Sequence, residues 1–287
     1  MSVSVLAAVA ALLIALMLFL KVGAPALSRR LIFKPERGKH DFKKPEFPDS
    51  VSHEHIFVTT PDGERLHGWL VGREHNQGLV LICHGNRGSI AGREDTALFY
   101  LELGLDVCLF DYRGYGRSTG SPSEQGTYTD VDAVWHYLTT ERGYNPGDVA
   151  LLGRSLGAAI AAHLASHAVP RAVILESTFS TLHDLATELY PLLKSLFNVH
   201  IKYNTLEKIP RIRAPLLLVH SSNDELIGIH HGHALQTAAP TGTELIEISG
   251  RHRDGFVTSK STYLPAVERF LEQHPPTTLI RRLEDRG

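Results

Sequence analysis

The motif Gly-x-Ser-x-Gly at residues 153–157 constrains this chain more than any other stretch, because of what flanks it. Residues 149–152 are apolar and predict a buried strand, and the Ala-rich residues 156–167 predict a helix. A serine at a sharp strand-to-helix turn is exposed in a strained backbone, and the two glycines let strand and helix approach closely. We therefore predict that Ser155 is a nucleophile, the alternative being a chance match to a short motif.

Short apolar runs alternate with stretches of helical periodicity along the rest of the chain, which predicts a mostly parallel sheet with helices on both faces. An Asp62-Gly63 turn between residues 55–59 and 66–70 predicts a hairpin before that sheet. The predicted strands are residues 78–83, 106–110, 149–152, 172–176, 215–220 and 244–248. The predicted helices are residues 93–102, 124–141, 156–167, 182–197, 230–238 and 261–273.

A serine nucleophile needs a base and an acid, which in this class follow the serine in the order acid, then histidine. Asp224 and His252 each lie just beyond a predicted strand, in that order. We expect His252 to take the serine proton and Asp224 to hold the imidazole in the required tautomer. Glu176, at the end of another strand, is the alternative acid.

An oxyanion formed at Ser155 needs two backbone N–H donors. The residue after the nucleophile, Leu156, supplies one at the positive end of the predicted helix. The turn after the strand at residues 78–83 supplies the other, and there we select Asn86.

Several other reactive side chains are predicted to be structural. His84 shapes its turn, Asp111 and Arg113 tie down their own loop by a charge-assisted bond, and Cys83 and Cys108 are buried free thiols. These two cysteines do not determine the redox compartment.

The chain has 17 histidines, of which His230, His231 and His233 are close enough in sequence to raise the question of a metal site. No acidic or cysteine cluster accompanies them in the sequence, and exposure at a helix N-terminus is the simpler explanation. We therefore expect neither a metal nor a cofactor.

Residues 1–22 form an apolar segment with no charge before Lys21, long enough to span a bilayer, and we predict a retained transmembrane anchor. A cleaved signal peptide is the alternative, since Ala24-Pro25-Ala26 imitates a cleavage site. The basic residues of a juxtamembrane linker at 23–49 favour a single-pass membrane protein with a cytosolic catalytic domain, although a solvated linker also explains them.

The remaining chain suits one domain at residues 50–274, with a short cap at about 179–210 and a polar tail at 275–287. The formal net charge of −2 gives no support to nucleic-acid binding. The cap is too short for a large lid, which favours an open acyl pocket.

Taken together, these residues resemble the α/β-hydrolase superfamily, and more closely the membrane-anchored group of α/β-hydrolase-domain-containing proteins 13 and 17 and their bacterial relatives. The resemblance implies the α/β-hydrolase fold, Ser155 as nucleophile, Asp224 as acid, His252 as base and an N-terminal anchor. Because the group includes protein depalmitoylases, it also points to a lipid or a lipidated protein as substrate. The motifs that carry it are His84-Gly85-Asn86-x-Gly88, Phe110–Gly116, Gly153-x-Ser155-x-Gly157, Glu176–Phe179, Asp224-Glu225 and Gly250-x-His252-x-Asp254.

One departure from this resemblance concerns charge. Arg87 and Arg253 stand where many members of the group carry Ala or Asn, which leaves the predicted triad intact and predicts an altered preference for substrate charge.

The sequence thus favours a membrane-anchored serine hydrolase that cleaves carboxylic esters or thioesters through an acyl-enzyme on Ser155. A serine peptidase of the same fold is one alternative, disfavoured because no large second domain is present to select peptides. A binding protein that kept the fold and lost the chemistry is the other.

Overall fold

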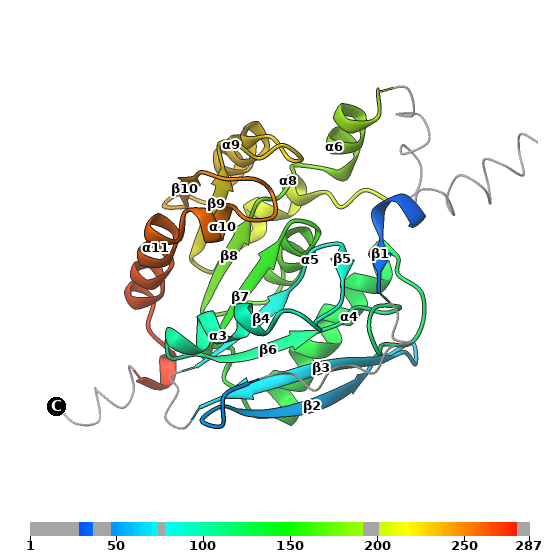
Figure 1. Ribbon diagram of the computed structural model, residues 1–287, viewed down its shortest axis with the longest axis vertical. Coiled ribbons are helices and arrows are strands. Elements are labelled where there is room, and N and C mark those ends of the chain that lie inside the picture. Colours follow the sequence, from blue (N-terminus) through cyan, green and yellow to red (C-terminus); the bar gives the residue numbers. More distant parts are fainter. Residues whose placement is uncertain (1–28, 37–46, 74–77, 192–200, 280–287) are drawn as a thin grey trace, which may run out of the picture.

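A central eight-stranded sheet dominates the computed structural model of the chain (Figure 1). The structure describes residues 29–36, 47–73, 78–191 and 201–279. The strand order is β10-β9-β8-β7-β4-β6-β3-β2, and every pairing from β10 to β6 is parallel. This is the α/β-hydrolase fold that the sequence predicts.

Each predicted strand is present with shifts of a few residues at its ends. The hairpin is longer than predicted, and it joins the sheet antiparallel through β3. The strands are β2 (Ser52–Thr59), β3 (Arg65–Gly72), β4 (Leu79–Cys83), β6 (Asp106–Phe110), β7 (Val149–Arg154), β8 (Ala172–Glu176), β9 (Leu216–Ser221) and β10 (Glu244–Ile248).

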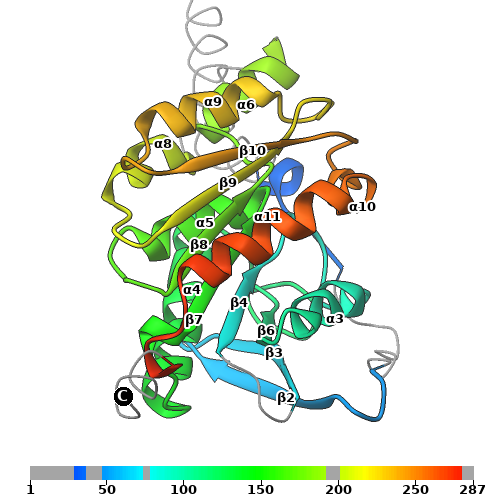
Figure 2. The same cartoon turned by 90° about the vertical axis from the view of Figure 1, so that its left-hand side faces the viewer.

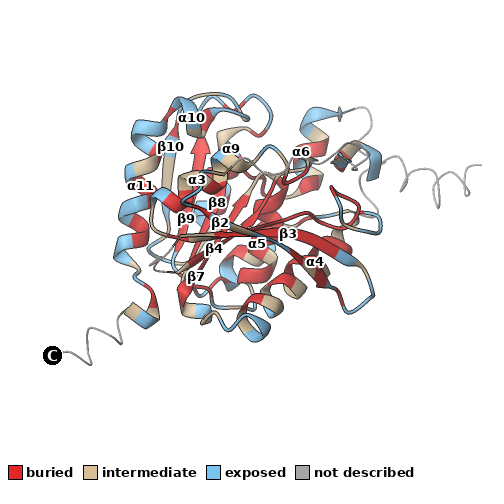
Figure 3. Ribbon diagram, turned by 60° about the horizontal axis from the view of Figure 1, so that its bottom comes forward, coloured by how far each residue is buried: buried red, intermediate tan, exposed pale blue. Residues whose placement is uncertain are grey.

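Helices cover both faces of the sheet, each over its own hydrophobic core (Figure 2). The alternation of side chains along a strand divides β4, whose Leu79, Leu81 and Cys83 enter one core while Val80 and Ile82 enter the other. The first core includes α4 (Glu124–His136), α5 (Leu156–Ala165) and α9 (Ile229–Ala238), and the second includes α3 (Glu94–Glu102) and α11 (Lys260–Gln273). Buried residues therefore concentrate in the central strands (Figure 3).

Two helices differ from the sequence prediction. The helix predicted at 124–141 is α-helical only to His136 and continues as a π-helical turn, η2 (Tyr137–Glu141). The helix predicted at 182–197 is α6 (Leu182–Leu189); residues 192–200 lie outside the described part of the chain. The other described elements of the predicted cap are α8 (Thr205–Lys208) and η5 (Ile209–Arg211).

The segment at residues 29–36 is not a solvated linker, as one interpretation of the sequence had it. Ile32 and Phe33 are buried in the first core. A two-residue strand β1 (Lys34–Pro35) pairs in parallel with β5 (Arg87–Gly88), immediately after the turn that contains Asn86. The described start of the predicted linker is thus part of the folded domain, because its apolar residues find a place in the core.

The predicted anchor, residues 1–22, lies outside the described residues. Among the residues that are described, no helix combines the length and the apolar character needed to cross a bilayer.

The predicted polar tail is described as far as Leu279, and this part is attached to the domain. The backbone N–H of Thr278 donates to the Asp148 carboxylate at 3.0 Å, and Thr277 donates its hydroxyl proton to the carbonyl of Gly147 at 3.3 Å.

Candidate active site

Ser155 stands at the turn between β7 and α5 in a backbone conformation that L-residues rarely adopt. Its φ is 54° and its ψ is −121°. Neighbouring structure holds this strained turn: the Ser155 N–H donates to the carbonyl of Glu176 at 2.9 Å, and the Thr178 hydroxyl donates to the carbonyl of Ser155 at 3.0 Å. Such strain persists only where the surroundings determine it, and it is typical of functional sites.

The two glycines of the motif are required because there is no room for a Cβ atom at either position. A Cβ on Gly153 would lie 2.5 Å from the Cα of Ala158, and a Cβ on Gly157 would lie 2.0 Å from the carbonyl oxygen of Cys83. Both contacts are with backbone atoms, which cannot move aside as a flexible side chain can. The close approach expected from the motif is therefore present on both sides of Ser155.

The fold brings Ser155, His252 and Asp224 into one chain of hydrogen bonds, although 97 positions separate the first two in sequence. The Nε2 atom of His252 lies 3.1 Å from the Oγ atom of Ser155. The Nδ1 atom of His252 lies 2.8 Å from Oδ2 of Asp224. These distances suit a serine whose proton passes to an imidazole that is oriented by a carboxylate.

Asp224 is buried, and its surroundings favour the carboxylate. Burial by itself raises the pKa of the Asp224 carboxyl, but the hydrogen bond and charge of His252, together with two backbone hydrogen bonds, outweigh it and hold that pKa below the usual value. The backbone N–H groups of Leu226 and Ile227 add two hydrogen bonds to Oδ1, at 2.9 and 2.8 Å. The carboxylate is thus able to stabilise an imidazolium.

The loop that carries His252 is held from two sides. Glu225 accepts a hydrogen bond from the His252 N–H at 2.9 Å. The guanidinium of Arg154 donates to the carbonyls of His252 and Arg253 at 2.9 and 2.8 Å. Nothing in the sequence separated these positioning residues from ordinary surface charges.

Glu176, the alternative acid, is fully buried and engaged elsewhere. Its carboxyl accepts a hydrogen bond from the Tyr263 hydroxyl, which in turn lies 3.0 Å from the hydroxyl of Tyr100. Burial raises the pKa of Glu176. The structure places Asp224, and not Glu176, against the imidazole.

The predicted oxyanion donors lie at the ends of two adjacent strands, since β4 pairs with β7 and Cys83 is opposite Gly153. The backbone N–H groups of Asn86 and Leu156 form no hydrogen bond to another described residue. This position, where the connections of a parallel sheet diverge, is the one at which open α/β sheets bind ligands.

The turn around Asn86 is held by the N-terminal segment. The Asn86 carbonyl accepts hydrogen bonds from the Lys34 N–H at 3.0 Å and from the Tyr115 hydroxyl at 2.9 Å, and its side-chain amide donates to the carbonyl of Ile32 at 2.8 Å. Glu36 extends the contact by donating its N–H to Gly88 at 3.1 Å.

Comparison with known proteins assigns the chain to a family. The alpha/beta hydrolase fold family matches residues 78–200. An uncharacterized protein of Mycobacterium tuberculosis is 34% identical over 250 residues, which cover 85% of this chain and 87% of that protein. The alpha/beta hydrolase domain-containing protein WAV2 of Arabidopsis thaliana is 31% identical, covering 83% of each chain. This chain belongs to the α/β-hydrolase family.

Solved structures of other α/β-hydrolases share the fold. The esterase Pf2001 of Pyrococcus furiosus superposes with a TM-score of 0.70 over 85% of this chain and 98% of the esterase, at 21% sequence identity. At that identity the likeness concerns the fold alone.

One prediction about structural residues of this α/β-hydrolase was wrong. Asp111 and Arg113 do not bond to each other: Asp111 accepts the N–H of Ile90 at 2.8 Å, whereas Arg113 pairs with Asp62 at 2.7 Å and Asp130 at 2.9 Å. The two side chains leave the turn in different directions, which adjacency in sequence did not reveal. Cys83 and Cys108 are buried free thiols, as predicted.

The His230–His233 stretch also differs from expectation. An acid does accompany it, because the ligand-capable atoms of Glu188, His230 and His231 lie within 4.8 Å of one another. His231 is buried rather than exposed at the helix N-terminus, and its Nδ1 lies 3.2 Å from the backbone N–H of Ser180. That hydrogen bond gives His231 a structural role in joining α9 to the chain before α6.

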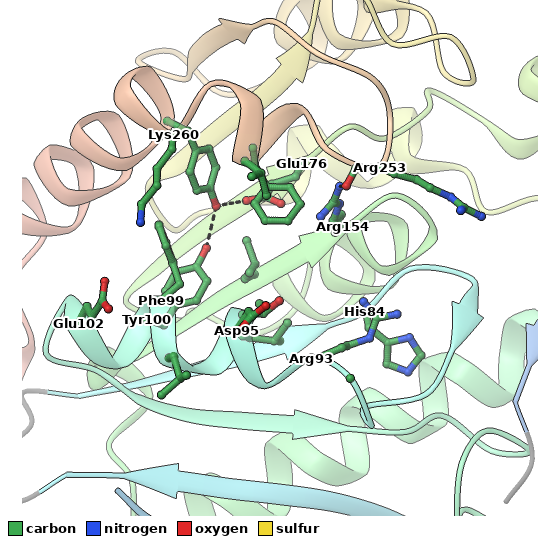
Figure 4. Close-up of a pocket in the computed structure, with 18 residues that line it drawn as sticks. His84, Arg93, Asp95, Phe99, Tyr100, Glu102, Arg154, Glu176, Arg253 and Lys260 are labelled. Carbon is green, nitrogen blue, oxygen red and sulfur yellow. Dashed lines mark hydrogen bonds between the residues drawn. The ribbon is translucent and has the colours of Figure 1, made fainter. Parts of the chain in front are cut away.

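A cavity of about 570 Å³ lies between α3 and the loop and helices at the carboxyl end of the domain (Figure 4). Ser155 does not line it. Arg154, which precedes Ser155, forms part of its wall, as do His84, Glu176 and Arg253. A much smaller hollow that reaches His252 shares Arg154 and Glu176 with it.

Proposed function

We propose that this protein is a serine hydrolase that cleaves carboxylic esters or thioesters through an acyl-enzyme on Ser155. The observation that carries the proposal is the hydrogen-bonded chain from Ser155 through His252 to Asp224, with 3.1 and 2.8 Å between its members. A carboxylate-oriented imidazole beside a strained serine is the arrangement that activates a hydroxyl for attack on a carbonyl.

The reaction proceeds in two halves. In the first, the Ser155 oxygen bonds to the substrate carbonyl carbon while its proton passes to Nε2 of His252, and the N–H groups of Asn86 and Leu156 stabilise the oxyanion. Collapse expels the alcohol or thiol, which takes that proton. In the second half a water molecule gives its proton to His252 and attacks the acyl-enzyme, which releases the acid and restores Ser155.

An ester or thioester is favoured over a peptide because the predicted cap at 179–210 is short and the described parts of residues 50–274 hold no large second domain. The proposal includes a lipid or lipidated protein as the substrate and a membrane anchor at residues 1–22 that leaves the catalytic domain in the cytosol. The resemblance to the membrane-anchored hydrolase group supports these two parts.

The proposal is tested with purified wild type and Ser155→Ala on p-nitrophenyl esters and acyl thioesters of increasing chain length. We expect wild type to hydrolyse one of these series and the variant to lose at least about 10³-fold in kcat, since the nucleophile is gone. Circular dichroism confirms that the variant is folded. Equal turnover by both proteins assigns the chemistry to another group, and no turnover of any substrate or peptide by wild type favours the binding-protein alternative.

A further inference from the structure

The cavity lined by Arg154 combines apolar walls with an unusual set of charges. Its volume of about 570 Å³ is within the range that small-molecule sites occupy. Its apolar wall contains side chains from β4, β7, α3 and the segment before α11: Ile82, Leu152, Leu98, Phe99, Phe256 and Val257. Such a space accepts an acyl or aryl group.

Two half-buried arginines face this cavity from opposite sides (Figure 4). Arg93 donates to the backbone carbonyls of Ser89 and Arg87 at 3.0 and 2.8 Å. Arg154 donates to the carbonyls of the His252 loop, and its guanidinium lies over the Phe256 ring, 4.1 Å from the ring centroid. Among the described residues, no carboxylate oxygen lies within 4.0 Å of either guanidinium group. Asp111 and Glu36 attract Arg93, and Glu176 attracts Arg154, but none of them forms an ion pair with these arginines. A partly desolvated cation without a counter-charge in contact is costly, and an anion bound between the two arginines lowers that cost.

The carboxyl groups that line the cavity do not serve as this counter-charge. Asp95 and Glu102 are exposed, and neither forms an ion pair with the two arginines. Glu176 is buried, accepts the Tyr263 hydroxyl, and has a pKa raised by burial, which favours its uncharged form. The exposed Arg253 and Lys260 add positive charge to the lining.

The cavity is connected to the reaction through Arg154 and the His252 loop, since neither Ser155 nor His252 lines it. Arg154 is the residue before Ser155, and its guanidinium holds the backbone of His252. The cavity and the small hollow at His252 also share Phe256 and Tyr263 in their linings. A group bound between the arginines can therefore belong to a substrate whose scissile bond lies at Ser155, and the inhibition experiment below separates this placement from a separate effector.

From this geometry we infer that the substrate is an anionic ester or thioester, with a carboxylate or phosphate bound between Arg93 and Arg154 and an apolar part along the Phe99 and Phe256 wall. The inference rests on the proposed hydrolase function and names its substrate class. It also revises the expectation that Arg87 and Arg253 alter charge preference: Arg253 lines the cavity, whereas Arg87 is exposed and contributes only its backbone carbonyl to Arg93.

Matched substrate pairs test the inference. The acyl pair is p-nitrophenyl hydrogen adipate and p-nitrophenyl hexanoate, and the alcohol pair is para-acetoxybenzoate and its methyl ester, each corrected for non-enzymatic hydrolysis. We expect wild type to prefer the anionic member of at least one pair by about tenfold or more in kcat/KM, the gain from one charge-assisted hydrogen bond. A preference for the neutral member, or none, in both pairs overturns the inference.

Variants separate recognition from positioning. Arg93→Gln and Arg154→Gln also loosen the backbone that they hold, which lowers turnover of both members of a pair equally. The informative readout is the anionic-to-neutral ratio of kcat/KM, which we expect to fall about tenfold in each variant and to recover in part in Arg93→Lys. Arg213→Gln, at an exposed arginine outside the cavity, is the matched control with an unchanged ratio. An unchanged ratio in both cavity variants contradicts the inference.

Inhibition by the free product anion distinguishes a substrate group from an effector. The anion to use is the product of the pair that shows the preference: adipate for the acyl pair, para-hydroxybenzoate for the alcohol pair. It should inhibit hydrolysis of the neutral ester competitively, and this inhibition should be weaker in Arg93→Gln. Activation or non-competitive inhibition contradicts the placement on the substrate. Failure of the proposed function looks different, because wild type then hydrolyses neither member of either pair faster than Ser155→Ala.

Discussion

The nucleophile turn and the oxyanion turn lie side by side at the ends of β7 and β4, yet different parts of the chain hold them in place. Ser155 is positioned by two glycines within two residues of it and by the neighbouring strand β8. Asn86 is positioned by a segment 54 residues earlier, which contributes both a backbone strand pair and an acceptor for its side chain.

The comparison shows that one catalytic element is encoded locally and the other is not. The close packing around Ser155 is made possible by the two glycines of the motif, while Glu176 and Thr178 hold the strained backbone by hydrogen bonds. The orientation of the Asn86 turn depends on the burial of Ile32 and Phe33, so the segment at residues 29–36 and the proposed oxyanion site are mechanically joined.

The largest expected effect concerns the partners of the nucleophile. Asp224→Asn should lower kcat by about 10⁴-fold, because the amide no longer holds the His252 tautomer or stabilises imidazolium. Glu176→Gln should change kcat far less, since its carboxyl contacts Tyr263 and not the imidazole. Steady-state hydrolysis of the preferred ester measures both, and reversed magnitudes move the acid to Glu176.

Two truncations test how the oxyanion turn is held. Deleting residues 1–22 leaves every described contact of residues 29–36 in place and should give an active protein that stays in the supernatant without detergent. Deleting residues 1–36 removes the β1 pairing and the acceptor for Asn86, and kcat should fall by about 10²–10³-fold, as when one oxyanion donor is lost.

Circular dichroism and thermal unfolding establish that the shorter protein is folded. Asn86→Ala in the longer protein is the matched control, since it removes only the side-chain bond to Ile32 and keeps the backbone donor. Equal kcat values for two folded truncations would show that the oxyanion turn does not depend on the N-terminal segment.

The smallest expected effect compares one glycine from each turn. Gly157→Ala should lower the free energy of unfolding by about 1–3 kcal/mol, because its Cβ would meet the Cys83 carbonyl at 2.0 Å. Gly85→Ala should cost less than about 0.5 kcal/mol, since its Cβ would make an ordinary 3.6 Å contact with Arg154. Thermal or urea unfolding measures both, and similar losses would contradict the local encoding of the nucleophile turn.

The elements that the sequence predicted well are those with local signals. Apolar periodicity located the eight strands of the main sheet and most helices, and motif spacing selected Ser155, Asp224 and His252, which the structure brings within hydrogen-bond distance. Each of these residues lies directly beyond a strand, so the parallel sheet alone accounts for their meeting at one edge.

The elements that it missed depend on contacts distant in sequence. A two-residue strand such as β1 has no periodicity to detect, and its partner β5 is equally short and directly follows Asn86. Arg113 pairs with Asp62 and Asp130, which lie 51 and 17 residues away in sequence. The arginines of the cavity likewise became informative only when their surroundings showed no carboxylate partner.

The most direct test of the central claim is covalent labelling with a fluorophosphonate, followed by peptide mapping of the modified residue. We predict that wild type is labelled on Ser155, that Ser155→Ala is not labelled, and that Asp224→Asn is labelled far more slowly, because the serine loses its oriented base. Labelling of folded Ser155→Ala at the wild-type rate, or mapping of the label to another residue, would contradict the account.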